Sequence, residues 1–209
     1  MDGAKPAKSP CPLGSKLSRH DGELLLDHIP YRQLVGAPQY CTLTWPEIAY
    51  FVNQLCQHLH NPSSTHWTTA KRVLRYLTSS FDHGIQYTMS QLQLNAFCNF
   101  DWAGCLNDRR STTGFAIFLG DCLISWSTKK QSVVSRSSID AKYKSLAITT
   151  TEVFWLWMLF KQLRACLVCE IDLWNGMAIP MELSILCLVG VYSWEQSFSW
   201  EWLIPYTQE

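Results

Sequence analysis

The chain has 209 residues, of which 47% are hydrophobic and 16% are charged, a composition that suits one or two compact domains with a hydrophobic core. Lysine and arginine balance aspartate and glutamate at 17 each, which excludes a global basic field that would attract nucleic acid. Any contact with nucleic acid therefore needs a local basic patch.

The first 30 residues contain several prolines, lysines and serines without an apolar period, and they predict a linker or tail. A first helix is predicted from Tyr31 to Thr42. Pro38 lies inside it. Because proline lacks an N–H group and its ring clashes with the preceding turn, we expect Pro38 to kink or end this helix.

A second helix is predicted to begin at residues 44–47, Thr-Trp-Pro-Glu. Thr44 can cap its first turn, and Glu47 can return the reciprocal bond of a capping box. Apolar residues from Ile48 to Leu59 then share one face, so this helix is expected to reach about residue 60. A turn at residues 61–64 leads into a third helix at about residues 65–77.

The pattern then changes to short segments rich in β-forming residues. Three strands are predicted, at Leu92 to Phe100, Gly114 to Leu119 and Cys122 to Ser127. Their connections are too short for crossovers, so the strands must form an antiparallel meander. A long helix is predicted from a second capping-box pattern at residues 137–140 to about Leu163. No element is predicted after Ala165.

The nine cysteines are an odd number without a framework spacing, and no signal peptide opens the chain. We therefore expect reduced thiols and an intracellular location, cytoplasmic or nuclear. The apolar stretch at residues 177–192 contains Pro180 and Glu182. Its uninterrupted part is shorter than the roughly 20 residues that a spanning helix needs, so no membrane association is predicted.

Several short motifs follow one another in the second half of the chain. They are Asp-Trp-Ala-Gly at 101–104, Asp-Arg-Arg-Ser-Thr-Thr-Gly at 108–114, Leu-Ile-Ser-Trp-Ser at 123–127, Lys-Lys-Gln at 129–131 and Val-Ser-Arg-Ser-Ser at 134–138. This series resembles the ribonuclease H region of copia-type retrotransposon polyproteins. Residues 31–36, 52–54 and 71–77 are similar to the segment that follows the reverse-transcriptase palm in that family. The resemblance covers about residues 1–164, and the palm with its paired polymerase aspartates is not in this chain.

The resemblance implies an α/β fold with four segments. They are a linker or tail (1–30), a helical segment like the reverse-transcriptase connection (31–84), a partial ribonuclease H-like domain (85–164) and a divergent tryptophan-rich tail (165–209). The tail departs from the family pattern as a frameshifted or substituted reading frame would. We expect the domain to be incomplete: a three-stranded antiparallel meander and one long helix, with the family's parallel strands and later helices missing or malformed. Part of the sheet edge and one helix face would then be exposed.

The family cleaves RNA in RNA–DNA hybrids with two magnesium ions that clustered carboxylates hold. Its first carboxylate lies on the central strand in the pattern Ser-Asp-Ala-Asp-Trp-Ala-Gly, and this chain has Asn99 there. Its second lies on the long helix in the pattern Ser-Ser-Thr-Glu-Ala-Glu-Tyr, and this chain has Lys142 there. Asparagine removes one negative charge and lysine reverses another, so the site changes by three charge units. We therefore expect no bound cofactor and no catalysis.

Two acids are candidates for residual metal binding. Asp101 shares strand parity with Asn99 and lies about 6.6 Å further along, so it is the candidate for a weak single-ion site. Asp172 is a poor match to the third family carboxylate, and the fourth has no counterpart. Asp140 lies two residues before Lys142 and points roughly 200° away around the helix, so it cannot replace the missing glutamate.

Basic residues near the expected active face are candidates for nucleic-acid contacts. They are Lys129, Lys130 and Arg136, and in a turn also Arg109 and Arg110, which Asp108 partly offsets. A solvated loop surface explains these lysines equally well. Trp102 could stack on a base, although burial against the long helix is the simpler expectation.

Three functions remain open. A catalytically inactive retrotransposon remnant ranks first, a module that binds RNA–DNA hybrids ranks second, and a residual ribonuclease that uses Asp101 and Asp172 ranks third.

Overall fold

The computed structural model describes residues 5–12, 16–163, 168–173 and 177–180. Within these ranges the chain forms two compact units. Of the described residues, the helical unit contains those up to Ile85 together with Cys105–Asp108, and the sheet unit contains Gln86–Gly104 and those from Arg109 to Pro180.

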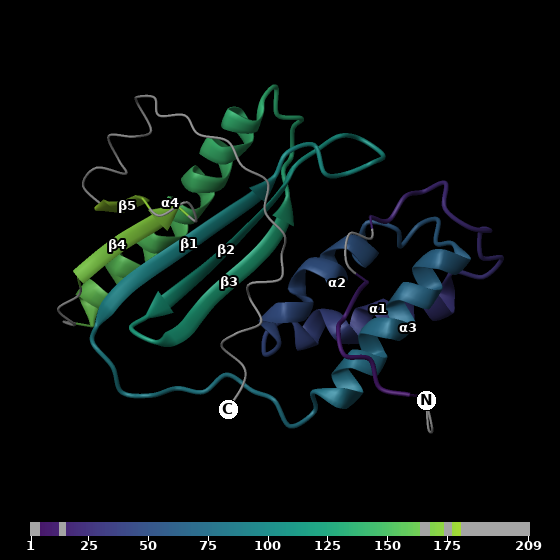
Figure 1. The fold of residues 1–209 in the computed structure, drawn as a ribbon, viewed down its shortest axis with the longest axis horizontal. Coiled ribbons are helices and arrows are strands. Elements are labelled where there is room, and N and C mark those ends of the chain that lie inside the picture. Colours follow the sequence, from purple (N-terminus) through teal and green to yellow (C-terminus); the bar gives the residue numbers. More distant parts are fainter. Residues whose placement is uncertain (1–4, 13–15, 164–167, 174–176, 181–209) are drawn as a thin grey trace. The chain divides into compact units, whose positions relative to one another are not determined.

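The helical unit contains four helical elements, α1 (Ile29–Cys41), the short 3-10 helix η1 (Pro46–Ile48), α2 (Ala49–Cys56) and α3 (Ser64–Ser79) (Figure 1). Apolar residues from each element form one core: Tyr31, Val35, Ile48, Val52, Leu55, Ala70 and Val73. The buried Tyr31 hydroxyl donates a hydrogen bond of 2.9 Å to the Leu55 carbonyl oxygen. The three predicted helices and the apolar face that begins at Ile48 are therefore confirmed.

The start of α3 is set by a reciprocal cap. The Ser63 hydroxyl accepts a hydrogen bond from the His66 N–H, and His66 Nδ1 accepts one of 2.9 Å from the Ser63 N–H. Each bond satisfies a donor that the first helical turn leaves without an intrahelical partner. This cap places the beginning of α3 within one residue of the predicted position.

α1 continues past Pro38 to Cys41, within one residue of the predicted end. Two details of the helical prediction are wrong. Thr44 and Glu47 form no capping box, because the Thr44 hydroxyl donates to the Cys41 carbonyl oxygen and Glu47 accepts from the Tyr76 hydroxyl. The second helix ends at Cys56 rather than near residue 60. The chain turns there, and the buried His58 ring stacks on the His66 ring at 3.9 Å.

The N-terminal segment contacts the helical unit. The Ala7 N–H donates to the Arg75 carbonyl oxygen, and Arg72 Nε donates to the Ser9 carbonyl oxygen. Further along, Leu24 forms a β-bridge with Ser63. These contacts align residues 7–9 and residue 24 with α3 and its first turn.

The described part of the sheet unit contains five strands and one long helix. In chain order they are β1 (Gln93–Asp101), β2 (Thr112–Leu119), β3 (Cys122–Lys130), α4 (Ser138–Gln162), β4 (Val168–Leu173) and β5 (Met177–Pro180). The strand order is β3-β2-β1-β4-β5, so β1 is the central strand. The pairs β1–β2 and β2–β3 are antiparallel, which confirms the predicted meander and the α/β class.

The expectation that parallel strands would be missing is wrong. β4 pairs with β1 in parallel, from Gln93 with Val168 to Cys98 with Leu173. β5 then pairs with β4 in antiparallel fashion. A parallel pair needs a crossover, and the 25 residues of α4 carry the chain from β3 to the other side of β1. The edge of β1 that the prediction left open is covered by β4.

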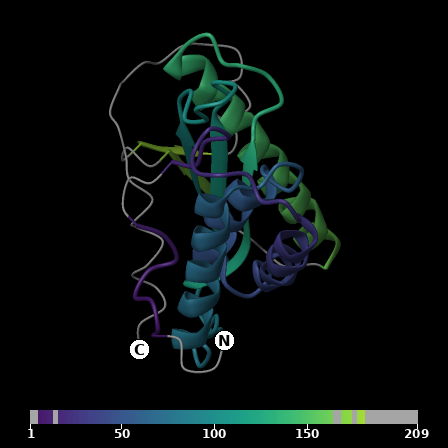
Figure 2. The same ribbon diagram turned by 90° about the vertical axis from the view of Figure 1, so that its right-hand side faces the viewer.

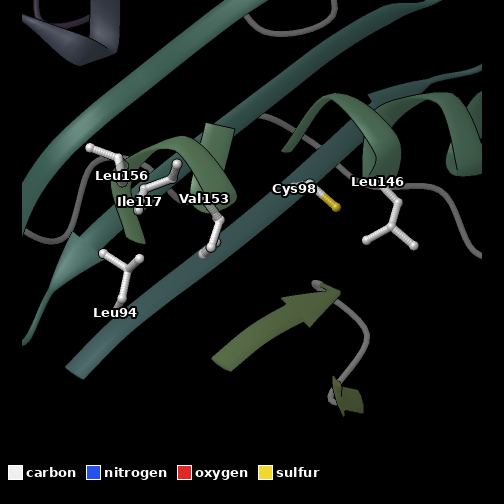
Figure 3. Packing of buried hydrophobic residues seen from close by; sticks show 7 residues of the cluster. Leu94, Cys98, Ile117, Leu146, Val153 and Leu156 are labelled. Atoms are coloured by element: carbon white, nitrogen blue, oxygen red, sulfur yellow. The ribbon is translucent and has the colours of Figure 1, made fainter. Parts of the chain in front are cut away.

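α4 lies on one face of this sheet (Figures 1 and 2). Side chains along β1 alternate between buried and half-buried as far as Cys98, the period of a strand with one face against a core. The core joins Leu94, Ala96, Cys98 and Ile117 of the sheet to Leu146, Val153 and Leu156 of α4 (Figure 3).

Trp155 of α4 is more than half exposed, as expected for a helix with one uncovered face. Among the described helices, none is both long and apolar enough to cross a membrane.

Candidate functional site

Strand register brings the predicted site positions to one end of the sheet. Asn99 pairs with Gly114, and Asp101 pairs with Thr112, which itself pairs with Lys130. The ends of β1 and β3 and the beginning of β2 therefore lie together. We call this region, with the first turns of α4, the β1–α4 end.

A buried glutamine fixes the start of α4 at the β1–α4 end. Gln131 Nε2 donates to Thr113 Oγ1 at 2.9 Å and to the Ala141 carbonyl oxygen at 3.1 Å. Its Oε1 accepts a bond of 2.7 Å from the Ser135 hydroxyl. Sequence reasoning noted Gln131 only as part of a motif, because its partners lie on β2 and α4 and no local pattern indicates them.

Asn99 and Lys142, which were predicted to occupy the positions of two metal-binding acids, lie near the crossing of α4 and β1. The Ser145 hydroxyl of α4 donates to the Asn99 carbonyl oxygen at 3.0 Å. Burial raises the pKa of the neighbouring Cys98 thiol to about 11, against opposing effects of hydrogen bonds to Thr149 and Ser145 and of the Lys142 charge. Lys142 precedes Ser145 by three residues and so lies on the same side of α4. The Asn99 side-chain oxygen accepts from the Phe100 N–H at 2.8 Å.

The Asp101 carboxylate is engaged in the connection between β1 and β2. Its Oδ1 accepts a hydrogen bond from the Thr112 N–H. Its Oδ2 lies so close to Gly104 that a Cβ there would come within 1.7 Å of it. Ala103 has a φ of 53°, and its N–H donates to the Ser111 hydroxyl at 3.1 Å. Asp101 thus helps to hold a tight loop, which limits its availability as a metal ligand.

Asp140 has two partners on its own side of α4. It forms an ion pair of 2.9 Å with Lys144 and accepts from the Arg136 N–H at 3.0 Å. The hydrogen bond to Lys144, then the one from Arg136, hold the pKa of Asp140 below its ordinary value. The Ser137 hydroxyl accepts from the Asp140 N–H, so half of the predicted capping box is present.

Asp172 lies on β4, where its backbone pairs with Phe97 of β1. Its strand is therefore the neighbour of the strand that carries Asn99. The side chain of Asp172 lies outside the part of the chain that the structure describes.

The donor set at the β1–α4 end does not fit two magnesium ions. Mg²⁺ prefers anionic and carbonyl oxygen ligands in octahedral geometry. The positions that would supply them carry an amide and an ammonium group, and a lysine ammonium has only donors. Over the described ranges, no group of three or more histidine, cysteine, aspartate or glutamate side chains could hold a metal ion.

Basic side chains outnumber acids at the β1–α4 end. Its described residues include five cations and two acids: Lys129, Lys130, Arg136, Lys142 and Lys144 against Asp101 and Asp140. Lys129 and Arg136 are exposed. Arg109, which has a φ of 56°, and Arg110 lie in the preceding connection between β1 and β2. The arrangement favours an anionic partner.

Trp102 lies at the same end and is not buried against α4, contrary to the simpler expectation. It is 53% exposed, and its indole N–H donates to the Ser135 carbonyl oxygen at 3.3 Å. That bond fixes an exposed aromatic ring beside Arg136.

Comparison with known proteins finds similar chains among transposon polyproteins. The chain is 44% identical over 161 residues to the retrovirus-related Pol polyprotein from transposon RE2 of Arabidopsis thaliana, and 43% identical over 161 residues to that from transposon RE1. Each match covers 77% of this chain, which spans 11% of the polyprotein.

An uncharacterized mitochondrial protein of the same plant, AtMg00810, is 46% identical over 152 residues, which are 72% of this chain and 63% of that protein. No family model matches the chain. No solved structure matches it either.

Proposed function

We propose that this chain, which belongs to the Pol polyprotein family of copia-type retrotransposons, carries a ribonuclease H-like domain that does not cleave RNA–DNA hybrids. One observation carries the proposal. At the crossing of β1 and α4, the two positions at which the family has metal-binding acids hold Asn99 and Lys142.

The topology supports the ribonuclease H-like assignment. The family takes its carboxylates from the central strand, from the long helix and from a strand after that helix. Here β1 is the central strand, α4 is the long helix, and β4 follows it and pairs with β1 in parallel. The three elements that would carry the acids are thus neighbours.

Electrostatics support the loss of catalysis. Two divalent cations a few ångströms apart repel each other unless anionic ligands offset their charge. A lysine at one ligand position adds a third cation to the two metal ions. Asp101 is the remaining acid on β1, and it accepts from the Thr112 N–H. That bond holds the carboxylate in the connection between β1 and β2, which disfavours a residual ribonuclease through Asp101 and Asp172.

The test is cleavage of a labelled RNA–DNA hybrid by the full chain, first with magnesium and then with manganese. The sample must melt cooperatively, so that a missing product reflects the site and not a misfolded chain. We expect no cleavage with either ion. Metal-dependent cleavage that a chelator abolishes would overturn the proposal.

A second candidate is a module that binds RNA–DNA hybrids without cleaving them. The excess of cations at the β1–α4 end and the exposed Trp102 ring favour it. Lys129, Lys130 and Arg136 are the expected phosphate contacts. Binding that weakens steeply with salt is the expected result, and an absence of salt-dependent binding would remove this candidate.

A further inference from the structure

We propose that the Lys142 ammonium group binds a nucleic-acid phosphate directly at the β1–α4 end, so that binding there needs no divalent cation. The inference rests on the proposed hybrid-binding function. It names Lys142 as the residue that allows the chain to bind a hybrid without a metal ion. The residues at the β1–α4 end do not fit two magnesium ions. Lysine at position 142 lacks a metal-binding carboxylate and supplies a positive charge in its place.

The position of Lys142 is set by contacts on both sides of it along α4. The preceding residue, Ala141, is buried, and its carbonyl oxygen accepts from Gln131. Three residues later Ser145 is buried, and its hydroxyl bonds to the Asn99 carbonyl oxygen. Residues three apart lie on the same side of a helix. Lys142 therefore lies on the flank of α4 beside the end of β1, and it is half-buried there.

The acids near Lys142 have other partners. Asp140 pairs with Lys144 and accepts from the Arg136 N–H. Asp101 accepts from the Thr112 N–H. In the part of the chain that the structure describes, no ion pair joins Lys142 to a carboxylate. A partly desolvated ammonium group without an anion is less stable than one with a partner, so a phosphate oxygen gains a charge-assisted hydrogen bond there.

The surroundings point to a phosphate in a polymer rather than to a single small anion. Lys129 and Arg136 are exposed at the same end, where they can contact further phosphates of one strand. The Trp102 ring is exposed and held by the Ser135 carbonyl oxygen. Cations beside an aromatic ring suit a nucleic-acid strand, which offers both phosphates and bases.

Fluorescence anisotropy with a labelled RNA–DNA hybrid tests the inference on the full chain. The first comparison is between a buffer with a chelator and a buffer with magnesium. We expect the affinity with chelator to equal or exceed that with magnesium, because a bound ammonium group needs no metal and magnesium competes for the phosphates.

The second comparison uses variants of α4. Lys142→Gln should lower the affinity with chelator and reduce the slope of log K against log salt by about 0.9, the value for one lost phosphate contact on a duplex. Lys142→Glu should weaken binding further, because it adds repulsion. The matched control is Lys161→Gln in the last turn of α4, where the ammonium group lies over the Trp157 ring, and it should leave the affinity unchanged.

The outcomes separate this inference from the function on which it rests. Wild-type binding that requires magnesium would overturn the inference, and so would a Lys142→Gln variant that melts like the wild type and keeps the full salt slope. In both cases hybrid binding itself would stand. A wild-type chain that binds no hybrid in either buffer would overturn the binding function together with the inference.

Discussion

The Asp101 carboxylate lies where a lone acid could still hold an ion, and its contacts give it a structural role instead. It accepts from the Thr112 N–H and lies against Gly104, in a loop whose Ala103 has a positive φ. A non-glycine residue with such a φ is uncommon and persists when surrounding contacts fix it. The carboxylate is one of these contacts.

Asp101→Ala should therefore lower the free energy of unfolding by about 1.5–3 kcal/mol, the range for a hydrogen bond to a charged group. Urea denaturation measures the change. The control is Asp121→Ala in the exposed turn between β2 and β3, which should change stability by no more than about 0.5 kcal/mol. Equal stabilities of the two variants would contradict the structural role of Asp101.

The cap of α3 makes the stability of the chain depend on pH. Burial lowers the pKa of His66 below its ordinary value of 6.5, against smaller opposing effects of Asp21 and Ser18. Between the two pKa values the unfolded chain binds more protons than the folded chain. The contribution of neutral His66 to the free energy of unfolding should therefore be fully present above about pH 6.5, and it should decrease as the pH falls below that value.

His66→Gln isolates this effect, because glutamine can complete the same capping box with Ser63 but does not titrate. Urea midpoints at neutral and mildly acidic pH should show a smaller decrease for the variant than for the wild type. The same decrease in both proteins would show that other groups cause the pH dependence.

Sequence reasoning located residues well where their partners are local. Ser137 caps α4 at the expected place, since it bonds to the third residue after it. The cap of α3 lies within the turn at residues 61–64 that was predicted to precede this helix. Sequence reasoning failed where the partner is distant. Glu47 was expected to bond within its own turn, but it accepts from Tyr76 on α3. The structural role of Asp101 was missed for the same reason, because Thr112 is eleven residues away.

At the scale of elements, α1 shows how tertiary packing outweighs a local breaker. Pro38 lacks the N–H that would bond to the carbonyl oxygen four residues earlier, yet the helix continues to Cys41. Pro38 is itself buried, and Tyr31 and Val35 on the same helix belong to the core. Burial of that face offsets the local cost of proline.

Pro38→Ala should raise the free energy of unfolding, by up to about 3 kcal/mol less the loss of buried ring surface, because it restores one helical hydrogen bond. Thermal and urea denaturation measure the gain. Pro46→Ala is the matched control: Pro46 is also buried but stands at a helix start, where no N–H is needed, so no gain is expected. A gain at both positions would mean that the missing hydrogen bond is not the cause.

Strand β4 could not be predicted from the local sequence pattern. The meander could be predicted because the connections between its strands are too short for crossovers. Gly120, with a φ of 58°, also suits a tight hairpin between β2 and β3. β4 has no such signal, since its partner β1 precedes it by about 75 residues and the whole of β2, β3 and α4 lies between them. Only the assembled sheet identifies it as a strand.

On the scale of the whole molecule, the chain combines a helical unit and a sheet unit, and the candidate chemistry belongs to the sheet unit. The α/β class was predictable from the sequence. The family resemblance predicts substituted metal-binding positions at Asn99 and Lys142, and in the structure Ser145, three residues after Lys142 on α4, bonds to the Asn99 carbonyl oxygen of β1. The account of these two positions requires that the site no longer binds divalent cations.

Manganese binding by the full chain tests that point most directly. Mn²⁺ is titrated into the protein, and the free ion is followed by its electron paramagnetic resonance signal. The Asn99→Asp, Lys142→Glu double variant serves as the matched comparison, because it restores both family acids. The account predicts no saturable uptake by the wild type and a measurable uptake by the double variant. Stoichiometric uptake by the wild type that disappears in Asp101→Ala would contradict it.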